Sequence, residues 1–129
     1  MKKIYISYAN QDLQLAKSVE TELKNNNLIA YFIDHTEENI HGDVANDMLS
    51  GIKNCDVFLC LYSKNSNQSN FVSIELNAAV KRDKQVYIIN VDKTYIEKKT
   101  NFAIANSILL KGDFKTALKE FISTIKGAI

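Results

Sequence analysis

The sequence predicts a single α/β domain, with a parallel sheet at its centre and helices on both faces. Two observations carry this prediction. Short, continuous apolar runs recur along the chain, and the segments between them have the period of amphipathic helices. Strands that are buried on both faces show such continuous runs, because neither face needs polar side chains. Right-handed crossovers between them give a doubly wound fold, for which five strands take the flavodoxin-like order 2-1-3-4-5.

The expected strands are rich in β-branched and aromatic residues. They are Ile4 to Tyr8, Ile29 to Ile33, Val57 to Tyr62 and Val86 to Val91, with a weaker fifth strand at Ser107 to Leu110. The polar segment from Lys93 to Thr100 fits a short helix or a loop equally well.

Four helices are expected between and after these strands. The first begins after Asn10 as its cap and ends in the asparagine run 25–27, which favours turn geometry. The third runs from about Asn70 to Arg82. The apolar positions of the second helix are Val44, Ala45, Met48, Leu49 and Ile52, and those of the last, capped by Asp113, are Phe114, Ala117, Leu118, Phe121, Ile122 and Ile125.

Composition narrows the class of protein. The 129 residues are expected to form one domain, 1–129, and 16 basic against 15 acidic residues leave a formal charge of +1. A chain with this balance has no net positive potential that would attract nucleic acid or an anionic membrane, so neither partner is expected. The N-terminus turns polar too early for a signal peptide, and no apolar run is long enough to span a bilayer. A cytoplasmic protein is therefore expected.

Cysteine and histidine usage argues against a metal site. Cys55 and Cys60 are the only cysteines, and Cys60 falls inside an apolar strand, so both are expected to be reduced and buried. His35 and His41 lie in a polar loop with no cysteine nearby. No metal is predicted.

Polar residues follow the first three expected strands, at the edge where ligands bind in doubly wound sheets. The stretches are Ser7 to Asp12, Asp34 to Asp43 and Ser63 to Asn70. Solvated connections explain polar loops equally well, so these stretches alone do not establish a site.

Glu75 is the more informative residue. It falls on the apolar stripe that Val72, Leu76 and Ala79 form along the third expected helix. A carboxylate on a core-facing stripe is unfavourable unless it is paired or opens onto a polar cleft. Glu75 therefore either pairs with a lysine at the stripe's boundary or points into a cleft at the carboxyl edge of the sheet, and breaks of a local rule concentrate at functional sites.

Four motifs resemble those of the Toll/interleukin-1 receptor (TIR) domain family. Ile4 to Tyr8, followed by Asp12, resembles the family's opening F-I-S-Y…D, and Ser69 to Leu76 resembles S-x-W-[CV]-x-x-E-L with Phe71 at the aromatic position. The segment from Ala30 to Asp34, with Gly42 and Asp43 downstream, resembles the second strand and the BB loop. The segment from Cys55 to Ser63 resembles the third strand.

The resemblance implies an activity for Glu75. In catalytic TIR domains the glutamate of the last motif is essential for cleaving the bond between nicotinamide and ribose in NAD⁺. NAD⁺ is then a substrate rather than a bound cofactor, and the product is ADP-ribose or a cyclic isomer of it. The resemblance also implies self-association through TIR–TIR contacts and points to antiphage signalling of the Thoeris type, in which a separate effector protein senses the product.

Supporting roles follow from the same resemblance. The expected substrate-binding residues around Glu75 are Ser7, Tyr8, Asp12, Phe32, Ser63, Ser69 and Phe71. The expected interaction loop contains Asp34, His41, Gly42 and Asp43, where His41 stands in place of the proline frequent in the family's BB loop. A cap, a turn or a packing aromatic is the alternative interpretation of each supporting residue.

Three other functions fit the same fold. A non-catalytic TIR–TIR interaction module, such as an adaptor or a virulence factor, is the main alternative, and a nucleoside deoxyribosyltransferase-like enzyme would use a similar glutamate. A response-regulator receiver is excluded, because Ser7-Tyr8 and Tyr62-Ser63 stand where that class needs acidic residues.

Overall fold

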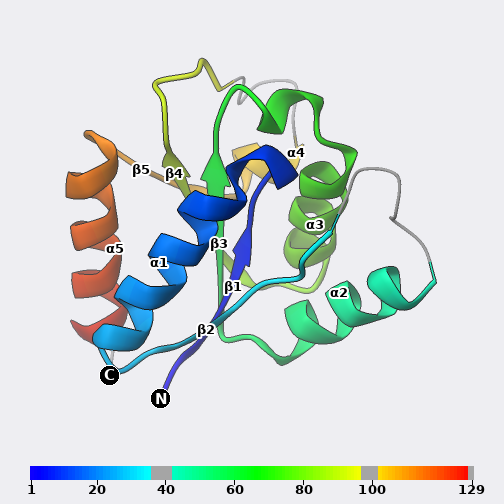
Figure 1. The fold of residues 1–129 in the computed structure, drawn as a ribbon, viewed down its shortest axis with the longest axis horizontal. Helices are drawn as coiled ribbons and strands as arrows, with labels where there is room; N and C mark the ends of the chain where they lie inside the picture. The colour runs from blue at the N-terminus through cyan, green and yellow to red at the C-terminus, as the bar shows by residue number, and fades with distance from the viewer. Residues whose placement is uncertain (36–41, 97–101, 128–129) are drawn as a thin grey trace.

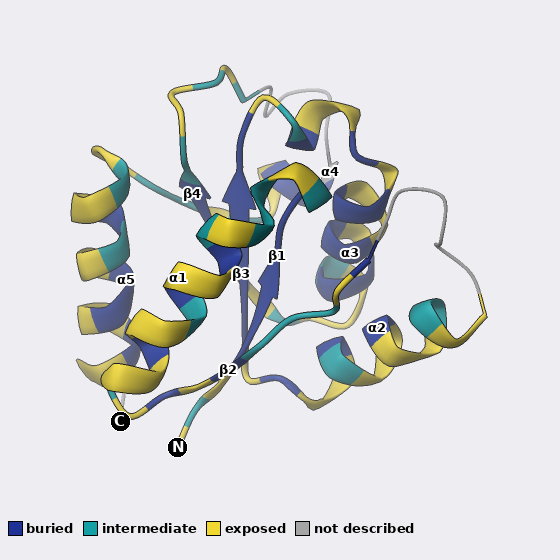
Figure 2. Ribbon diagram, in the orientation of Figure 1, coloured by how far each residue is buried: buried dark blue, intermediate teal, exposed yellow. Residues whose placement is uncertain are grey.

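The computed structural model describes residues 1–35, 42–96 and 102–127. Five parallel strands form one sheet in the order β2-β1-β3-β4-β5, which confirms the predicted topology. The strands are β1 (Lys3–Ser7), β2 (Ile29–Tyr31), β3 (Val57–Tyr62), β4 (Gln85–Asn90) and β5 (Ile108–Leu110). Every residue of the central strand β3 is buried, as its continuous apolar run predicts (Figure 2).

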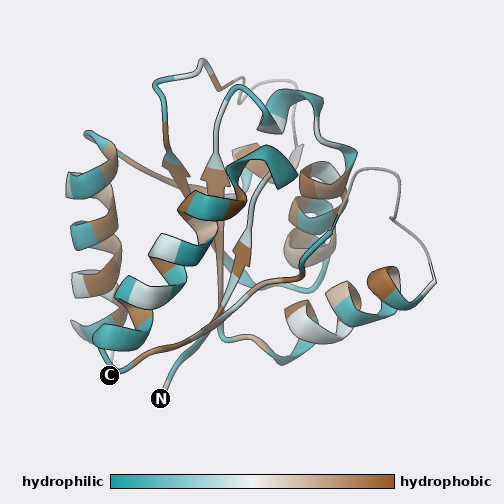
Figure 3. Ribbon diagram, in the orientation of Figure 1, coloured by the Kyte–Doolittle hydropathy of each residue, from teal (hydrophilic) through white to brown (hydrophobic). Residues whose placement is uncertain are grey.

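The helices cover the sheet in two layers (Figure 1). α1 (Leu13–Asn25) and α5 (Phe114–Gly127) pack on one face, whereas α2 (Asp43–Asn54), α3 (Asn70–Lys81) and the short α4 (Phe102–Ala105) pack on the other. Figure 3 shows the apolar strands at the centre and hydrophilic positions along the outer sides of the helices.

Alternation along β1 divides its side chains between the two layers. Ile4 and Ile6 join the core under α1 and α5, whereas Tyr5 joins the core under α2 and α3. Successive side chains of a strand point to opposite faces, so Ser7 lies on the same face as Tyr5. This face of β1 carries the candidate site.

The helix ends differ from the prediction at one place. Asn10–Asp12 forms a 3₁₀ turn, η1, and α1 begins only at Leu13, so Asn10 does not cap the helix. Other helix ends agree with it: Asn27 takes a positive φ of 64°, and the Asp113 carboxylate accepts a hydrogen bond of 2.8 Å from the backbone N–H of Thr116 at the start of α5.

β3 has the predicted bounds, and the other strands are shorter than predicted or shifted by one residue. β2 ends at Tyr31 rather than Ile33, and β4 covers 85–90 rather than 86–91. In the segment 93–100, residues 93–96 have no regular structure, and the rest lies outside the described residues.

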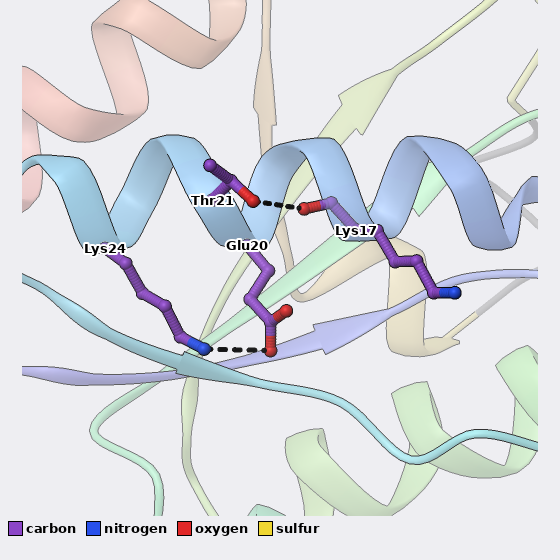
Figure 4. A network of polar contacts seen from close by, with 4 residues as sticks. All are labelled: Lys17, Glu20, Thr21 and Lys24. Carbon is purple, nitrogen blue, oxygen red and sulfur yellow. Dashed lines mark hydrogen bonds and ion pairs between the residues drawn. The ribbon is translucent and has the colours of Figure 1, made fainter.

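Side chains of α1 form local pairs along the helix (Figure 4). Lys24 and Glu20 form an i,i+4 ion pair of 3.5 Å, and the Thr21 hydroxyl donates to the carbonyl of Lys17 at 3.1 Å. Exposed pairs of this kind contribute little stability. The outer face of α1 is therefore an ordinary solvated helix surface.

Candidate active site

Glu75 is buried on α3, with 1% of its surface exposed. Its carboxylate faces β1, where the Ser7 hydroxyl donates to Oε1 at 2.6 Å and the Tyr5 hydroxyl donates to Oε2. Both carboxylate oxygens thus accept hydrogen bonds from side-chain hydroxyls of one strand. These bonds offset part of the cost of burying a polar group against a sheet.

The carboxylate lies over the second half of β1. The sequence left two positions open for Glu75, a pair with a lysine or a cleft at the carboxyl edge of the sheet. Tyr5 and Ser7 are two residues apart and point to the same side, and Ser7 is the last residue of the strand, at that edge. The carboxylate is as deeply buried as these two residues and is shielded from solvent.

Cys60 completes the buried polar group from the neighbouring strand. It pairs with Ser7 across the β1–β3 register and is fully buried. Burial raises the pKa of its thiol, and the nearby Glu75 carboxylate raises it further. Both cysteines are free and buried, as predicted.

Aromatic packing holds Tyr5 in place beside the other carboxylate oxygen, Oε2. Its ring stacks on Phe58, with centroids 5.6 Å apart, and meets Tyr31 edge-on at 5.7 Å. Gly51 of α2 allows this close approach, because a Cβ there would lie only 2.8 Å from Cε2 of the Tyr5 ring. Burial and the Glu75 carboxylate raise the pKa of Tyr5, so its hydroxyl stays protonated and donates.

Four aromatic rings form a second cluster beside Glu75. One of them, Phe71, lies on the same helix as Glu75. Phe71 precedes Glu75 by one turn, and the His35 ring stacks on it with centroids 3.7 Å apart and an interplanar angle of 11°. The centroid of the Tyr8 ring lies 5.1 Å from that of His35 and 5.2 Å from that of Phe32. The Tyr8 hydroxyl donates to the carbonyl of Ile33. Burial, Asp34 and Glu75 raise the pKa of Tyr8, in that order. Of the predicted residues, Tyr8 and Phe71 therefore lie near Glu75, and Phe32 joins the cluster through its contact with Tyr8.

The remaining predicted substrate-binding residues support the loop after β3. The Ser63 hydroxyl donates to Asp12 at 2.6 Å, and the Asn65 amide donates to the same carboxylate at 3.1 Å. The Ser69 hydroxyl caps α3 by accepting from the backbone N–H of Val72 at 3.1 Å. Asp12, Ser63 and Ser69 thus form capping and turn contacts in the described part of the chain.

The expected interaction loop is described only at its ends. Asp34 and Asp43 are exposed, and Gly42 takes a positive φ of 66° at the start of α2. His41 lies outside the described residues.

Three surface cavities lie among the described residues. A cavity of about 580 Å³ lies beyond the ends of β4 and β5, lined by residues such as Asn90, Lys93 and Phe114. A second cavity, of about 270 Å³, lies between η2 (Ser66–Gln68) and α4, and a third, of about 290 Å³, lies between α1 and α5. Glu75 does not line any of these three cavities, and its side chain is buried.

Three residues of this region did not emerge as site residues from the sequence: Tyr5, His35 and Cys60. Tyr5 could have been found, because a strand period of two places it on the same face as Ser7. His35 carried no signal beyond its place in a polar loop. Among described residues, no group of three or more His, Cys, Asp or Glu side chains could hold a metal ion. No helix within the described ranges is long and apolar enough to cross a membrane.

Comparison with known proteins places this geometry in a family. The sequence profile of the TIR domain matches residues 4–122, so the chain belongs to the TIR-domain family. A search of curated protein sequences finds no match.

Solved structures with the same fold include three of different kinds. A prokaryotic SEFIR domain is 14% identical, with a TM-score of 0.68 over 97% of this chain and 92% of its own. A CMP N-glycosidase, BcmB, from Clostridium botulinum is 15% identical, with a TM-score of 0.61 over 97% and 99%. A 2-desoxiribosyltransferase from Leishmania mexicana is 16% identical, with a TM-score of 0.55 over 73% and 66%. At these identities the likeness shows the fold alone.

Proposed function

We propose that this TIR domain cleaves the bond between nicotinamide and ribose in NAD⁺, with Glu75 as the catalytic residue. One observation carries the proposal: the glutamate of the family motif is buried on α3 and bonded to hydroxyls of β1. A carboxylate held in this way has a fixed orientation and little competing water, the conditions under which it stabilises developing charge most strongly.

The chemistry needs only one carboxylate. In NAD⁺ the nicotinamide ring is bonded to ribose as a positively charged pyridinium. When that bond breaks, nicotinamide leaves as a neutral molecule, so no general acid has to protonate it. Positive charge then develops on the ribose, as in the oxocarbenium-like transition state of glycosidases. A fixed anion beside C1′ lowers the energy of that state. Capture of the ribose by water gives ADP-ribose, and capture by another group of the same molecule gives a cyclic isomer.

Substrate access requires a conformational change, because the Glu75 carboxylate is shielded from solvent. Once the neighbouring side chains part, ribose hydroxyls can donate to the carboxylate that Tyr5 and Ser7 hold in place. TIR domains commonly self-associate, and we propose that assembly favours this opened state.

A second candidate is cleavage of another N-glycosidic bond. Two proteins with the same fold are named as a CMP N-glycosidase and a 2-desoxiribosyltransferase. A buried carboxylate that stabilises a ribose cation in NAD⁺ would serve a nucleotide or nucleoside equally well, because the charge develops on the sugar in either case.

The biological role that we propose follows from the activity. An ADP-ribose-derived product can diffuse to a separate effector protein, as in antiphage signalling of the Thoeris type. The alternative role is that of a non-catalytic TIR–TIR interaction module.

Incubation of the purified chain with NAD⁺, CMP or a deoxynucleoside, over a range of protein concentrations, tests the proposal. Mass spectrometry is expected to find nicotinamide and ADP-ribose or its cyclic isomer, with a rate per molecule that rises with concentration. Base release from CMP or the deoxynucleoside alone would favour the second candidate. Self-association without cleavage of any substrate, abolished by Gly42→Arg, would favour the interaction module.

A further inference from the structure

His35 occupies an unusual position for a polar side chain. Only 5% of its surface is exposed, and its ring lies flat on Phe71 and beside Tyr8. Phe71 and Glu75 are one helical turn apart on α3, so their side chains lie on the same face of that helix. The imidazole therefore lies next to the region in which the proposed function places the substrate.

The hydrogen bonding of the imidazole determines its tautomer. Nδ1 lies 3.0 Å from the carbonyl oxygen of Ile33, which can only accept, so Nδ1 carries the proton. In the neutral ring, Nε2 then presents a lone pair. Nε2 is buried, and no described residue gives it a hydrogen-bond partner. The described part of the chain thus contains a buried acceptor without a donor.

Folding alone does not account for this acceptor. Buried polar atoms without a partner are rare and destabilising. The carbonyl of Ile33 does not need His35, because the Tyr8 hydroxyl also donates to it at 3.2 Å. An apolar ring would cover Phe71 equally well without leaving a lone pair unpaired. Such local costs concentrate at functional sites.

We propose that His35 is a substrate-binding residue, whose Nε2 accepts a hydrogen bond from a neutral donor on the nicotinamide-riboside half of a dinucleotide. The ligand identity rests on the proposed function. Two groups of that half have the required chemistry: a ribose hydroxyl and the carboxamide N–H of nicotinamide. Such a group donates to Nε2 once the surrounding side chains open to admit the ligand.

The variant His35→Phe separates this role from a structural one. It keeps a flat ring on Phe71 and removes the orphan acceptor, while Tyr8 still satisfies the carbonyl of Ile33. We expect a thermal midpoint that is unchanged or higher, together with weaker ligand binding. His35→Gln, which restores an acceptor at the position, is expected to recover part of the affinity.

Two probes that the protein does not cleave identify the donor. ADP-ribose carries the ribose hydroxyls without the carboxamide, and nicotinamide carries the carboxamide alone. Titration calorimetry is expected to show about tenfold weaker binding to His35→Phe for the probe that donates to Nε2, the effect of one hydrogen bond. Histidine ¹⁵N NMR of the unmodified chain is expected to show the Nε2 resonance moving on addition of that probe.

The outcomes distinguish this proposal from the proposed function. A lower thermal midpoint for His35→Phe, equal affinities of both probes for the two proteins, or an Nε2 resonance that neither probe moves would overturn the assignment of His35. If the chain fails to cleave NAD⁺ but binds a probe through Nε2, the proposed reaction is wrong and the binding site stands.

Discussion

The Tyr5 hydroxyl donates a hydrogen bond to Oε2 of Glu75, and both side chains are closed off from solvent. The F-I-S-Y motif that this segment resembles has phenylalanine at the position of Tyr5, so the hydroxyl is a departure of this chain from that motif. The bond joins the middle of β1 to α3 and fixes one oxygen of the carboxylate.

The substitution Tyr5→Phe is expected to lower both stability and turnover of NAD⁺. Loss of the bond leaves Oε2 with one donor fewer and costs about 1–3 kcal/mol in the free energy of unfolding, measurable in urea. A less firmly positioned carboxylate is expected to reduce kcat by about ten- to hundredfold, with a smaller change in KM. Tyr31→Phe is the matched control, because it removes a hydroxyl of the same aromatic cluster, which bonds to the carbonyl of Gly51 at 2.7 Å. Equal kcat values for the two variants would contradict a positioning role for Tyr5.

Gly51→Ala tests the packing that holds Tyr5. The new Cβ would lie 2.8 Å from the Tyr5 ring, which Phe58 and Tyr31 prevent from moving away. Overpacking of this kind is expected to cost about 1–3 kcal/mol and to reduce NAD⁺ turnover. Gly127→Ala at the end of α5, where a Cβ meets nothing within 4 Å, is expected to leave stability and turnover unchanged. Full stability of Gly51→Ala would show that the ring has room to move.

The two thiols report whether the candidate site is closed in solution. Burial raises the pKa of Cys55 to about 11, and burial together with Glu75 raises that of Cys60. At pH 8 only about one Cys55 thiol in a thousand is then a reactive thiolate, and Cys60 is also fully buried. Intact-mass measurement is expected to find no alkylation by iodoacetamide in the folded chain and two additions in denaturant. Rapid labelling of Cys60 in the folded chain would contradict the burial of this thiol between the sheet and its helices in solution.

Asp113 is expected to contribute a stability term that disappears in acid. The backbone N–H and the hydroxyl of Thr116 donate to its carboxylate and hold its pKa below the usual value. A lowered pKa in the folded state means that stability is present above the unfolded pKa, about 4, and is lost as pH falls through the lower, folded pKa. The loss of thermal midpoint on acidification below about pH 4 is expected to be smaller for Asp113→Asn than for Asp47→Asn, an exposed control on α2. An identical loss of thermal midpoint in the two variants would contradict a stabilising role of the Asp113 carboxylate.

The fold was predictable because local pattern and topology agree. Continuous apolar runs such as that of β3, rich in β-branched and aromatic residues, are typical of strands covered on both faces, and right-handed crossovers leave few arrangements of five such strands. The burial of Glu75 was also predictable, since its helical stripe includes Val72 and Leu76.

The immediate surroundings of Glu75 were harder to predict. Which oxygen meets Tyr5 and which meets Ser7 depends on how α3 docks on β1, a long-range contact that no local period encodes. The role of Asp12 was equally hidden, because its partner Ser63 lies 51 residues away. The stacking of His35 on Phe71 requires the segment after β2 and the first turn of α3 to meet in space, and neither segment carries a pattern that specifies it.

The central claim is that the Glu75 carboxylate stabilises a ribose cation, and the rate of nicotinamide release from NAD⁺ by Glu75→Gln tests it most directly. The amide keeps the size of the side chain and an acceptor oxygen but has no negative charge. We expect a loss of roughly a thousandfold in kcat relative to the unmodified chain. Glu120→Gln, which removes an exposed charge from α5, is expected to retain full activity. Nicotinamide release by Glu75→Gln at the rate of the unmodified chain, with the fold intact, would contradict the account.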